Sequence, residues 1–587
     1  QKHDLSLQGG NNKVSYYFSA GYMDDNSVLN YGTDYFKRIN TLAKIDVAIT
    51  DWWTFGYESR FVKKVREKPN MTKEGDYSFM YRHISRAYPI TPLYDGFGNY
   101  MFESHIPSIT AGTDKLNELE TWNNFRMEIK PLKDWKINAD FAYQVYNGET
   151  INAKKYIYIY DLNNQPYANG VSIPNNLTKR NTIKKYWTTN IYTSYSFDLL
   201  ENNHFTVMAG MQFEKGNNSW VQGYKTDMIS DNITSFATAT GDALLSDALA
   251  HNATESFFGR VNYNYNDRYL LEVNLRDDGS YVFRKNNRWG LFPSFSAGWN
   301  LHNEKFWEVI SPVVNTMKVR ASWGQLGNQN INPYSDLELV PIQTGKLNWV
   351  FNYGSTRPVG YTTAPGIVNK NLTWEKATTT NVGTDLSFLN NKLKTTFDYF
   401  ERKTTDMIGP SEAKPGVLGA SSPKDNNSTL RTRGWELSIE WNQSFSNGLS
   451  YNLGASLYNY KSVVTKYFNP TGTLSTWYEG SEVGDIWGYT VNDLFRTKED
   501  LEAYTSKVDL RHLGSTWNTG DLKYEDTNND GKVDNGKNTI SDHGDLKIIG
   551  NSEPHYQYTI SGGASYKGFD FSMLWKGVAK KDIYFYR

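Results

Sequence analysis

A run of acidic and amide residues toward the C-terminal end of the chain has the spacing of a calcium-binding loop. In DTNNDGKVD (526–534), oxygen-bearing residues stand at positions 1, 3, 5 and 9 of an EF-hand-like loop, and glycine stands at position 6. Calcium binds several oxygen ligands at once, and the glycine permits the sharp turn that gathers them. The candidate ligands are Asp526, Asn528, Asp530, the carbonyl of Lys532, Asp534 and Asp545.

Position 12 of this loop is Lys537, where an EF-hand has a bidentate glutamate. A further carboxylate has to come from elsewhere, and Asp542 and Asp545 are the candidates. The alternative is a turn that holds no ion, because Asn, Asp and Gly also stabilise tight turns through local hydrogen bonds. The sequence thus leaves a structural calcium ion and an ion-free turn as open interpretations, and it indicates no other cofactor.

Four aromatic residues precede the acidic run within TWYEGSEVGDIWGY (476–489). Flat rings stack on sugar faces and on peptide side chains, so these residues are candidate substrate contacts in a long loop. The same rings can instead pack against one another inside that loop. The residues concerned are Trp477, Trp487, Tyr478 and Tyr489.

Enzyme chemistry finds little support in the sequence. The nine histidines include no H-E-x-x-H motif and none beside a G-x-S-x-G elbow, and the chain contains no cysteine. Asp277 and Asp278 are adjacent in a predicted strand, so their side chains point to opposite faces and cannot share a substrate. The net charge of −1 gives no sign of a nucleic-acid surface. We predict a protein that is not an enzyme and does not bind nucleic acid.

The segment FFGRVNYNYNDRYLLEVNLRDDGS (257–280) alternates apolar and polar residues on both sides of an Asn-Asp-Arg turn. Successive side chains of a strand point to opposite faces, so the pattern predicts a hairpin with one apolar and one polar face. Similar alternation predicts about 18 strands, most of them 10 or more residues long. Their centres lie near residues 6, 18, 42, 58, 124, 140, 190, 212, 260, 274, 296, 320, 380, 397, 436, 455, 560 and 574.

Short and long connections alternate along the chain, which is the layout of an outer-membrane barrel. Short turns such as residues 266–268 and 390–391 alternate with long loops such as residues 64–118, 326–370 and 465–553. Without an apolar stretch of 18 residues, membrane helices are excluded, and only a closed barrel of strands can satisfy its backbone in lipid. We predict an all-β fold, a transmembrane antiparallel β-barrel with an apolar outer face. The lipid-facing side chains are expected to include Leu271, Val273, Leu275, Leu393, Phe397 and Tyr399, and the lumen-facing ones Glu272, Asn274, Arg276, Lys394 and Asp398.

Three long segments stand out: LRDDGSYVFRKNNRWGLFPSFSAGWNLHNEKFW (275–307), NKNLTWEKATTTNVGTDLSFLNNKLKTTFDYFERKTTDMI (369–408) and EGSEVGDIWGYTVNDLFRTKEDLEAY (479–504). They resemble the SusC/RagA-like family of TonB-dependent outer-membrane transporters. The resemblance implies that residues 1–587 are the barrel domain, with about 18 strands of a 22-stranded barrel. It also implies a plug and one strand before Gln1, three strands after Arg587, and a long extracellular loop insertion at 465–553.

The resemblance further implies a multi-pass importer of oligosaccharides or oligopeptides in the outer membrane of a Gram-negative bacterium. Its expected partners are a SusD-like surface lipoprotein in a 2+2 assembly, the TonB complex acting through the absent N-terminal region, and outer-membrane lipid. A passive porin and a surface adhesin barrel are the alternative functions. The residues do not decide between glycan and peptide.

Overall fold

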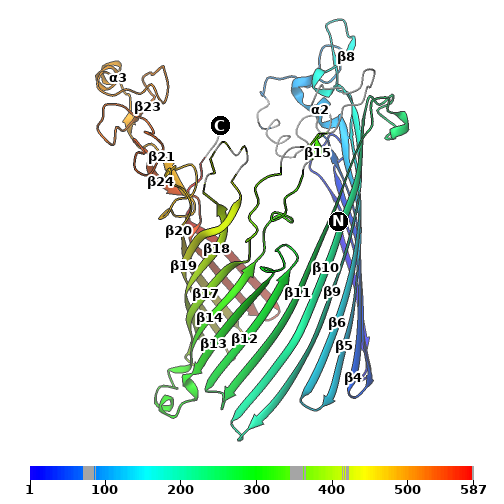
Figure 1. Ribbon diagram of the computed structural model, residues 1–587, viewed down its shortest axis with the longest axis vertical. Helices are drawn as coiled ribbons and strands as arrows, with labels where there is room; N and C mark the ends of the chain where they lie inside the picture. Colours follow the sequence, from blue (N-terminus) through cyan, green and yellow to red (C-terminus); the bar gives the residue numbers. More distant parts are fainter. Residues whose placement is uncertain are drawn as a thin grey trace. The chain divides into compact units, whose positions relative to one another are not determined.

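Strands dominate the computed structural model, which describes residues 1–70, 88–340, 365–412 and 422–584 and isolated positions between these ranges. One antiparallel sheet contains 18 strands (Figure 1). Their bounds are β1 Lys2–Gly10, β2 Val14–Asn26, β3 Tyr35–Thr50, β4 Trp53–Pro69, β5 Gly112–Leu132, β6 Trp135–Lys154, β9 Asn176–Leu199, β10 Asn203–Thr226, β11 Leu244–Tyr265, β12 Tyr269–Ser280, β13 Trp289–Asn300, β14 Val314–Asn328, β17 Glu375–Phe388, β18 Leu393–Pro410, β19 Lys424–Ser444, β20 Ser450–Lys466, β25 His555–Tyr566 and β26 Phe569–Lys580.

Each of the 18 strand centres predicted from the sequence lies inside one of these strands. The alternation was sufficient to locate the strands. A strand between an apolar and a polar environment must carry residues of the same kind at every second position. The short turns are also where they were expected, at residues 266–268 and between Phe388 and Leu393, for example. The prediction of the strand pattern is confirmed.

Smaller elements lie in the connections between the long strands. They are η1 Phe102–Ser104, α2 Ile106–Thr110, β7 Tyr158–Tyr160, β8 Pro166–Ala168, η2 Gly170–Ser172, η3 Phe236–Thr238, η4 Leu301–Asn303, η5 Lys305–Val309, β15 Ile342–Gln343 and β16 Tyr361–Thr362, and further ones follow β20. Among the described residues, no helix combines the length and the apolar composition that a membrane span requires.

The chain divides into two compact units, the first comprising residues 1–195 and 208–257, the second residues 196–207 and 258–587. In the first unit, β1 to β6 and then β9 pair in chain order, each antiparallel to the next. In the second unit, the same meander runs through β12, β13, β14, β17, β18, β19, β20, β25 and β26. Sequential pairing lets short turns join neighbouring strands.

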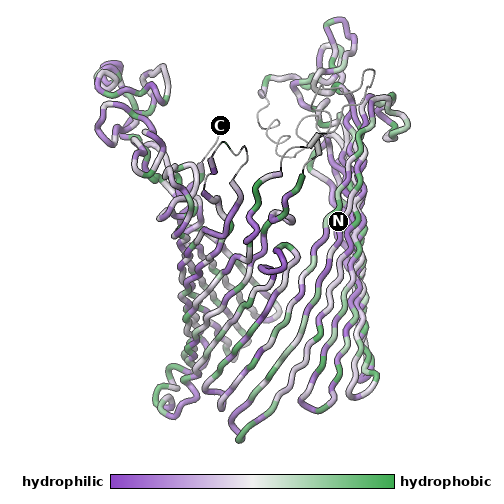
Figure 2. The backbone as a smooth tube through the Cα atoms, in the orientation of Figure 1, coloured by the Kyte–Doolittle hydropathy of each residue, from purple (hydrophilic) through white to green (hydrophobic). Residues whose placement is uncertain are grey.

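The apolar face of the second unit is its more exposed face. In β12, Leu271 is 49% exposed and Leu275 48% exposed, whereas Glu272, Asn274 and Arg276 between them are half-buried. Phe397 and Tyr399 of β18 are likewise exposed, whereas Asp398 is half-buried and Leu393 is intermediate. Figure 2 shows the alternation of hydropathy along the strands. This pattern is the reverse of a water-soluble sheet, and it places the apolar residues where lipid would contact them.

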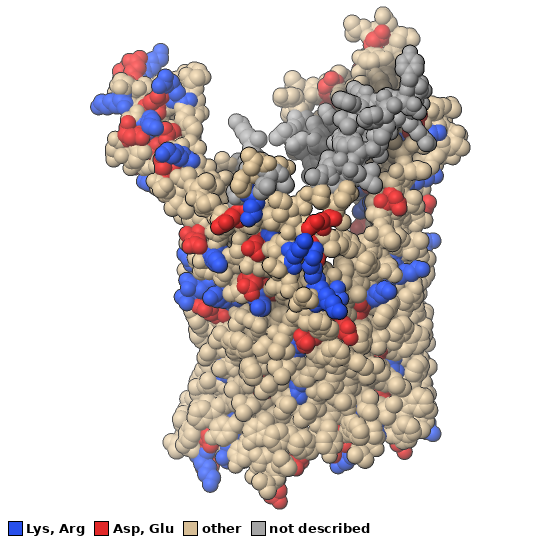
Figure 3. Space-filling view, viewed as in Figure 1, with Lys and Arg blue, Asp and Glu red and all other residues tan. Residues whose placement is uncertain are grey.

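Charged residues gather toward one end of the strands, above a broad, sparsely charged band (Figure 3). One reason is that several strands are longer than the roughly 9–11 residues that a membrane strand needs. The segment 64–68 was expected in a loop, but β4 continues through it to Pro69. There, Lys64 Nζ lies 3.7 Å from Glu118 Oε2 of β5. In this last part of β4, charged residues that pair across strands replace the alternation of apolar and polar residues. The alternation in the sequence therefore ends before the strand does.

The face assignment predicts unequal effects of two arginine substitutions. Val273→Arg places a charge on the exposed apolar face and should lower the free energy of unfolding in lipid by about 2–4 kcal/mol. Ser296→Arg is the matched control, because Ser296 of β13 is in register with Glu272 on the polar face. Ser296→Arg should lower the free energy of unfolding by less than about 1 kcal/mol, since the new arginine gains the Glu272 carboxylate as a partner. Urea unfolding in vesicles measures both, and equal destabilisation by the two variants would contradict the assignment.

Candidate functional site

Ion pairs on the polar face reach across an intervening strand. In the second unit, Arg320 of β14 and Asp398 of β18 flank Gly383 of β17, because both residues are in register with it. The Arg320 guanidinium donates two hydrogen bonds of 2.6 Å to the Asp398 carboxylate and two longer ones, of 3.1 and 3.5 Å, to Asp385. A Cβ at position 383 would stand 2.5 Å from Asp398 Oδ1. Glycine in the middle strand therefore leaves the room in which the pair forms.

The first unit repeats this arrangement. Asp46 of β3 and Arg126 of β5 are both in register with Gly56 of β4, and Arg126 Nη2 donates to Asp46 Oδ1 at 2.9 Å. A Cβ at position 56 would lie 2.6 Å from Asp46 Oδ1. Sequence reasoning missed both pairs. A signal was present, since an isolated glycine inside a strand often marks the close approach of another group.

A pocket of about 500 Å³ lies against the polar face of the second unit. Its lining includes amides, hydroxyls and charges of both signs, namely His204, Asn262, Asn264, Glu272, Ser296, Lys318, Arg320, Ser322 and Asn381. Such groups exchange hydrogen bonds with water or with a polar solute, and Tyr263, Leu270 and Leu271 add apolar surface to the same lining. The predicted polar residue Glu272 is part of this wall, whereas Lys394 is exposed on β18.

The connection between β20 and β25 folds around a small core of its own. Phe495, Val508, Leu510 and Val533 are buried together there. The connection also contains two strand pairs and one helix: β21 Asp485–Gly488 with β24 Lys547–Asn551, β22 Val491–Leu494 with β23 Leu522–Tyr524, and α3 Lys498–Thr505. Thr497 Oγ1 caps the helix by accepting from Asp500 N at 3.1 Å. Regular structure in this long loop was not predicted.

The four candidate aromatic contacts occupy different environments within this connection. Tyr489 packs against the core and lies edge-on to Tyr524, with ring centroids 6.1 Å apart. The ring centroids of Trp487 in β21 and of His543 lie 5.5 Å apart, and Tyr478 is half-buried. Trp477 is 38% exposed and lies edge-on to Tyr467. The four rings thus have different neighbours, and Trp477 is the most exposed of the four residues.

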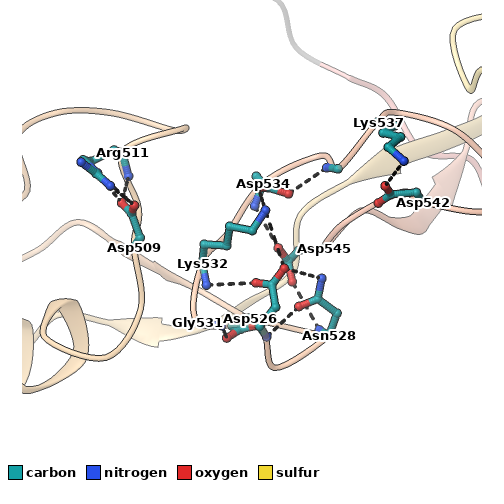
Figure 4. Close-up of polar contacts among 12 residues, drawn as sticks. Asp509, Arg511, Asp526, Asn528, Gly531, Lys532, Asp534, Lys537, Asp542 and Asp545 are labelled. Carbon is teal, nitrogen blue, oxygen red and sulfur yellow. Dashed lines mark hydrogen bonds and ion pairs between the residues drawn. The ribbon is translucent and has the colours of Figure 1, made fainter.

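The acidic run forms a tight turn in which carboxylates accept backbone hydrogen bonds (Figure 4). Asp526 accepts from the backbone N–H groups of Asp530 and Gly531, at 3.2 and 2.9 Å. Asp545 is fully buried, and it accepts from Thr527 N at 2.7 Å and from Asp534 N at 2.9 Å. Asp545 therefore closes the turn from a distant position in the sequence.

Lysine and arginine side chains already neutralise part of the negative charge near this turn. Lys532 Nζ lies 2.5 Å from Asp534 Oδ2, and its hydrogen bond lowers the pKa of that carboxyl. The Arg511 guanidinium, hydrogen-bonded to Asp509, lowers the pKa of Asp509 to about 2. Within the part of the chain that the structure describes, no group of three or more acidic or histidine side chains is arranged to hold a metal ion. Calcium binding by Asp526, Asn528, Asp530, Lys532, Asp534 and Asp545 stays a prediction.

Comparisons with known proteins agree on one family. Residues 63–572 match the family model described as "TonB dependent receptor-like, beta-barrel". The TonB-dependent receptor SusC of Bacteroides thetaiotaomicron is 25% identical over 626 residues, which cover 99% of this chain and 58% of SusC. The TonB-dependent receptor P26 of Formosa agariphila is 24% identical over 619 residues, which cover 99% of this chain and 57% of P26. The chain thus spans less than two thirds of these relatives.

Solved structures share the fold at lower sequence identity. The RagAB peptide importer in its open-open state superposes with a TM-score of 0.79 at 20% identity, over 99% of this chain and 61% of that one. The outer membrane transporter YddB from Escherichia coli gives a TM-score of 0.51 at 9% identity, over 96% of this chain and 61% of that one. These matches confirm the predicted transmembrane antiparallel β-barrel and the resemblance to SusC and RagA.

The calcium hypothesis predicts protection of the 467–554 connection from trypsin. Adding calcium after EGTA treatment should slow cleavage at the lysines of this connection, because the ion would fix several oxygens of one turn. Asp526→Ala with Asp530→Ala should abolish the effect. Asp509→Ala, which removes a carboxylate outside the turn, should leave it intact. Equal cleavage of the unmodified protein with and without calcium would show an ion-free turn.

Proposed function

Because the chain belongs to the TonB-dependent receptor-like β-barrel family, we propose that it is the barrel of an energised outer-membrane importer. The proposed substrates are oligosaccharides or oligopeptides. The family match over residues 63–572 carries the proposal. The name of one similar structure, a peptide importer, supports oligopeptides. Oligosaccharides are proposed from the resemblance to the SusC/RagA-like family.

The chemistry of the two sheet faces is consistent with this role. Exposed apolar residues such as Leu271 suit contact with lipid, and the opposite face presents amides, hydroxyls and paired charges such as Arg320 with Asp398. A hydrated oligomer can exchange hydrogen bonds with such a wall. A barrel of the proposed width is too wide for side chains to fill, so a plug must close it and uptake then requires energy.

We also propose that a SusD-like surface lipoprotein covers the barrel in a 2+2 assembly. The long connections at the far ends of the strands supply the surface for capture and docking. The connection between β20 and β25 has its own core and exposes Trp477, so it is a proposed point of contact with the substrate or the lid. The proposed contact region also includes Tyr478, Trp487 and Tyr489, whose main role there is to support its shape.

The importer proposal predicts that uptake requires TonB. Cells that produce the full-length protein should grow on the cognate oligomer and should stop growing on it when TonB is deleted. Growth on the corresponding monomer, which enters through general porins, is the control and should persist in both strains. Unimpaired growth on the oligomer without TonB would identify a passive porin.

The 467–554 connection can be shortened without disturbing the sheet. Gly488 of β21 is in register with Lys547 of β24, so residues 489–546 can be replaced by an Asn-Gly turn that closes the remaining ribbon. We expect this variant to insert normally but to lose co-purification with the lipoprotein or to grow more slowly on the oligomer. Heat-dependent gel migration checks the barrel. A variant with unchanged lid binding and unchanged growth would exclude the connection from both roles.

A further inference from the structure

The connection between β13 and β14, residues 301–313, exposes a cluster of apolar side chains. It contains the short helices η4 and η5 and is longer than the turn at 266–268 (Figure 1). Phe306 is 56% exposed, Val309 87%, Ile310 43% and Val313 58%. We call these four residues the apolar foot. Water is a poor environment for so much adjacent apolar surface, so the foot is expected to have a partner.

The apolar foot stands on a well-packed base. Trp307 is 6% exposed, and its Nε1 donates to the carbonyl of Val314 at 2.9 Å. His302 Nδ1 lies 3.0 Å from the carbonyl of Met317, and Leu389 N donates to the carbonyl of Val313 at 3.1 Å. The connection is therefore tied to the neighbouring strands, and its exposed side chains are held in place.

Hydrogen bonds also attach the connection to the apolar face of the sheet. Tyr269 and Trp299 are in register at the ends of β12 and β13, on the same face as Leu271. Glu304 Oε1 accepts from Tyr269 Oη at 2.8 Å and from Trp299 Nε1 at 3.1 Å. The connection thus begins at the edge of the exposed apolar face, beside two aromatic residues of the kind that lie at membrane interfaces.

We propose that the apolar foot enters the periplasmic leaflet of the outer membrane at the boundary between headgroups and acyl chains. Three observations favour lipid as its occupant: the foot adjoins the lipid-facing surface through Glu304, aromatic residues mark that level, and the foot alternates with the exposed charges Lys305 and Glu308. Apolar side chains beside charged ones are typical of segments that lie in the interface plane. The foot thereby fixes the depth of this rim in the membrane. The inference rests on the proposed membrane location of the barrel.

Single-cysteine labelling tests the proposal directly, because residues 1–587 contain no cysteine, and any cysteine elsewhere in the full-length protein is first replaced by serine. The full-length protein, purified alone and reconstituted in nanodiscs, would carry an environment-sensitive dye at Val309→Cys or Val313→Cys. Leu271→Cys on the apolar strand face is the lipid reference. Ser446→Cys, an exposed position in the turn between β19 and β20, is the aqueous reference at the same rim. Heat-dependent gel migration confirms that each variant retains its barrel.

We expect brominated lipids to quench the dyes at 309 and 313 to an extent comparable with position 271. Aqueous iodide should quench them several-fold less than the dye at 446. If iodide quenches the dyes at 309 and 313 as strongly as the dye at 446, the barrel proposal is unaffected, but the proposal for the apolar foot is wrong. Protection from both quenchers would also overturn it, since the segment would then be covered by protein. Failure of brominated lipid to quench even position 271 would instead refute the membrane location itself.

Discussion

Strand pairing forces successive side chains onto opposite faces of the sheet, and the separation of apolar from polar residues follows from this alternation. A strand that crosses lipid must complete its backbone hydrogen bonds with neighbouring strands. One face then has to suit lipid and the other water. Leu271, Val273 and Leu275 meet the first demand, while Glu272 and Arg276 meet the second.

The polar face shows how charges are accommodated within the same constraint. Neighbouring strands lie about 4.8 Å apart, so residues separated by a middle strand are out of reach unless that strand carries little bulk. Gly383 provides this opening for Arg320 and Asp398, and Gly56 does so for Arg126 and Asp46. Each pair links the two strands that flank the glycine-bearing strand.

Sequence reasoning recovered the features that depend on local periodicity. The strand centres and the short turns follow from alternation and from turn residues, both visible within about ten residues of sequence. Features set by distant contacts escaped it. The strand extension at 64–68 is stabilised by ion pairs with β5, and the core around Phe495 assembles segments on both sides of α3. Asp545 was identified by chemistry, but its burial and its role as an acceptor for Thr527 and Asp534 needed the fold.

Lipid accessibility along β12 measures whether its apolar face contacts lipid. A nitroxide placed at each position from 269 to 276 in turn, in the reconstituted protein, reports its contact with oxygen dissolved in lipid and with a water-soluble nickel chelate. We expect oxygen accessibility to peak at 269, 271, 273 and 275, and chelate accessibility to peak at the positions between them. A uniform profile, or one with the opposite phase, would contradict the face assignment.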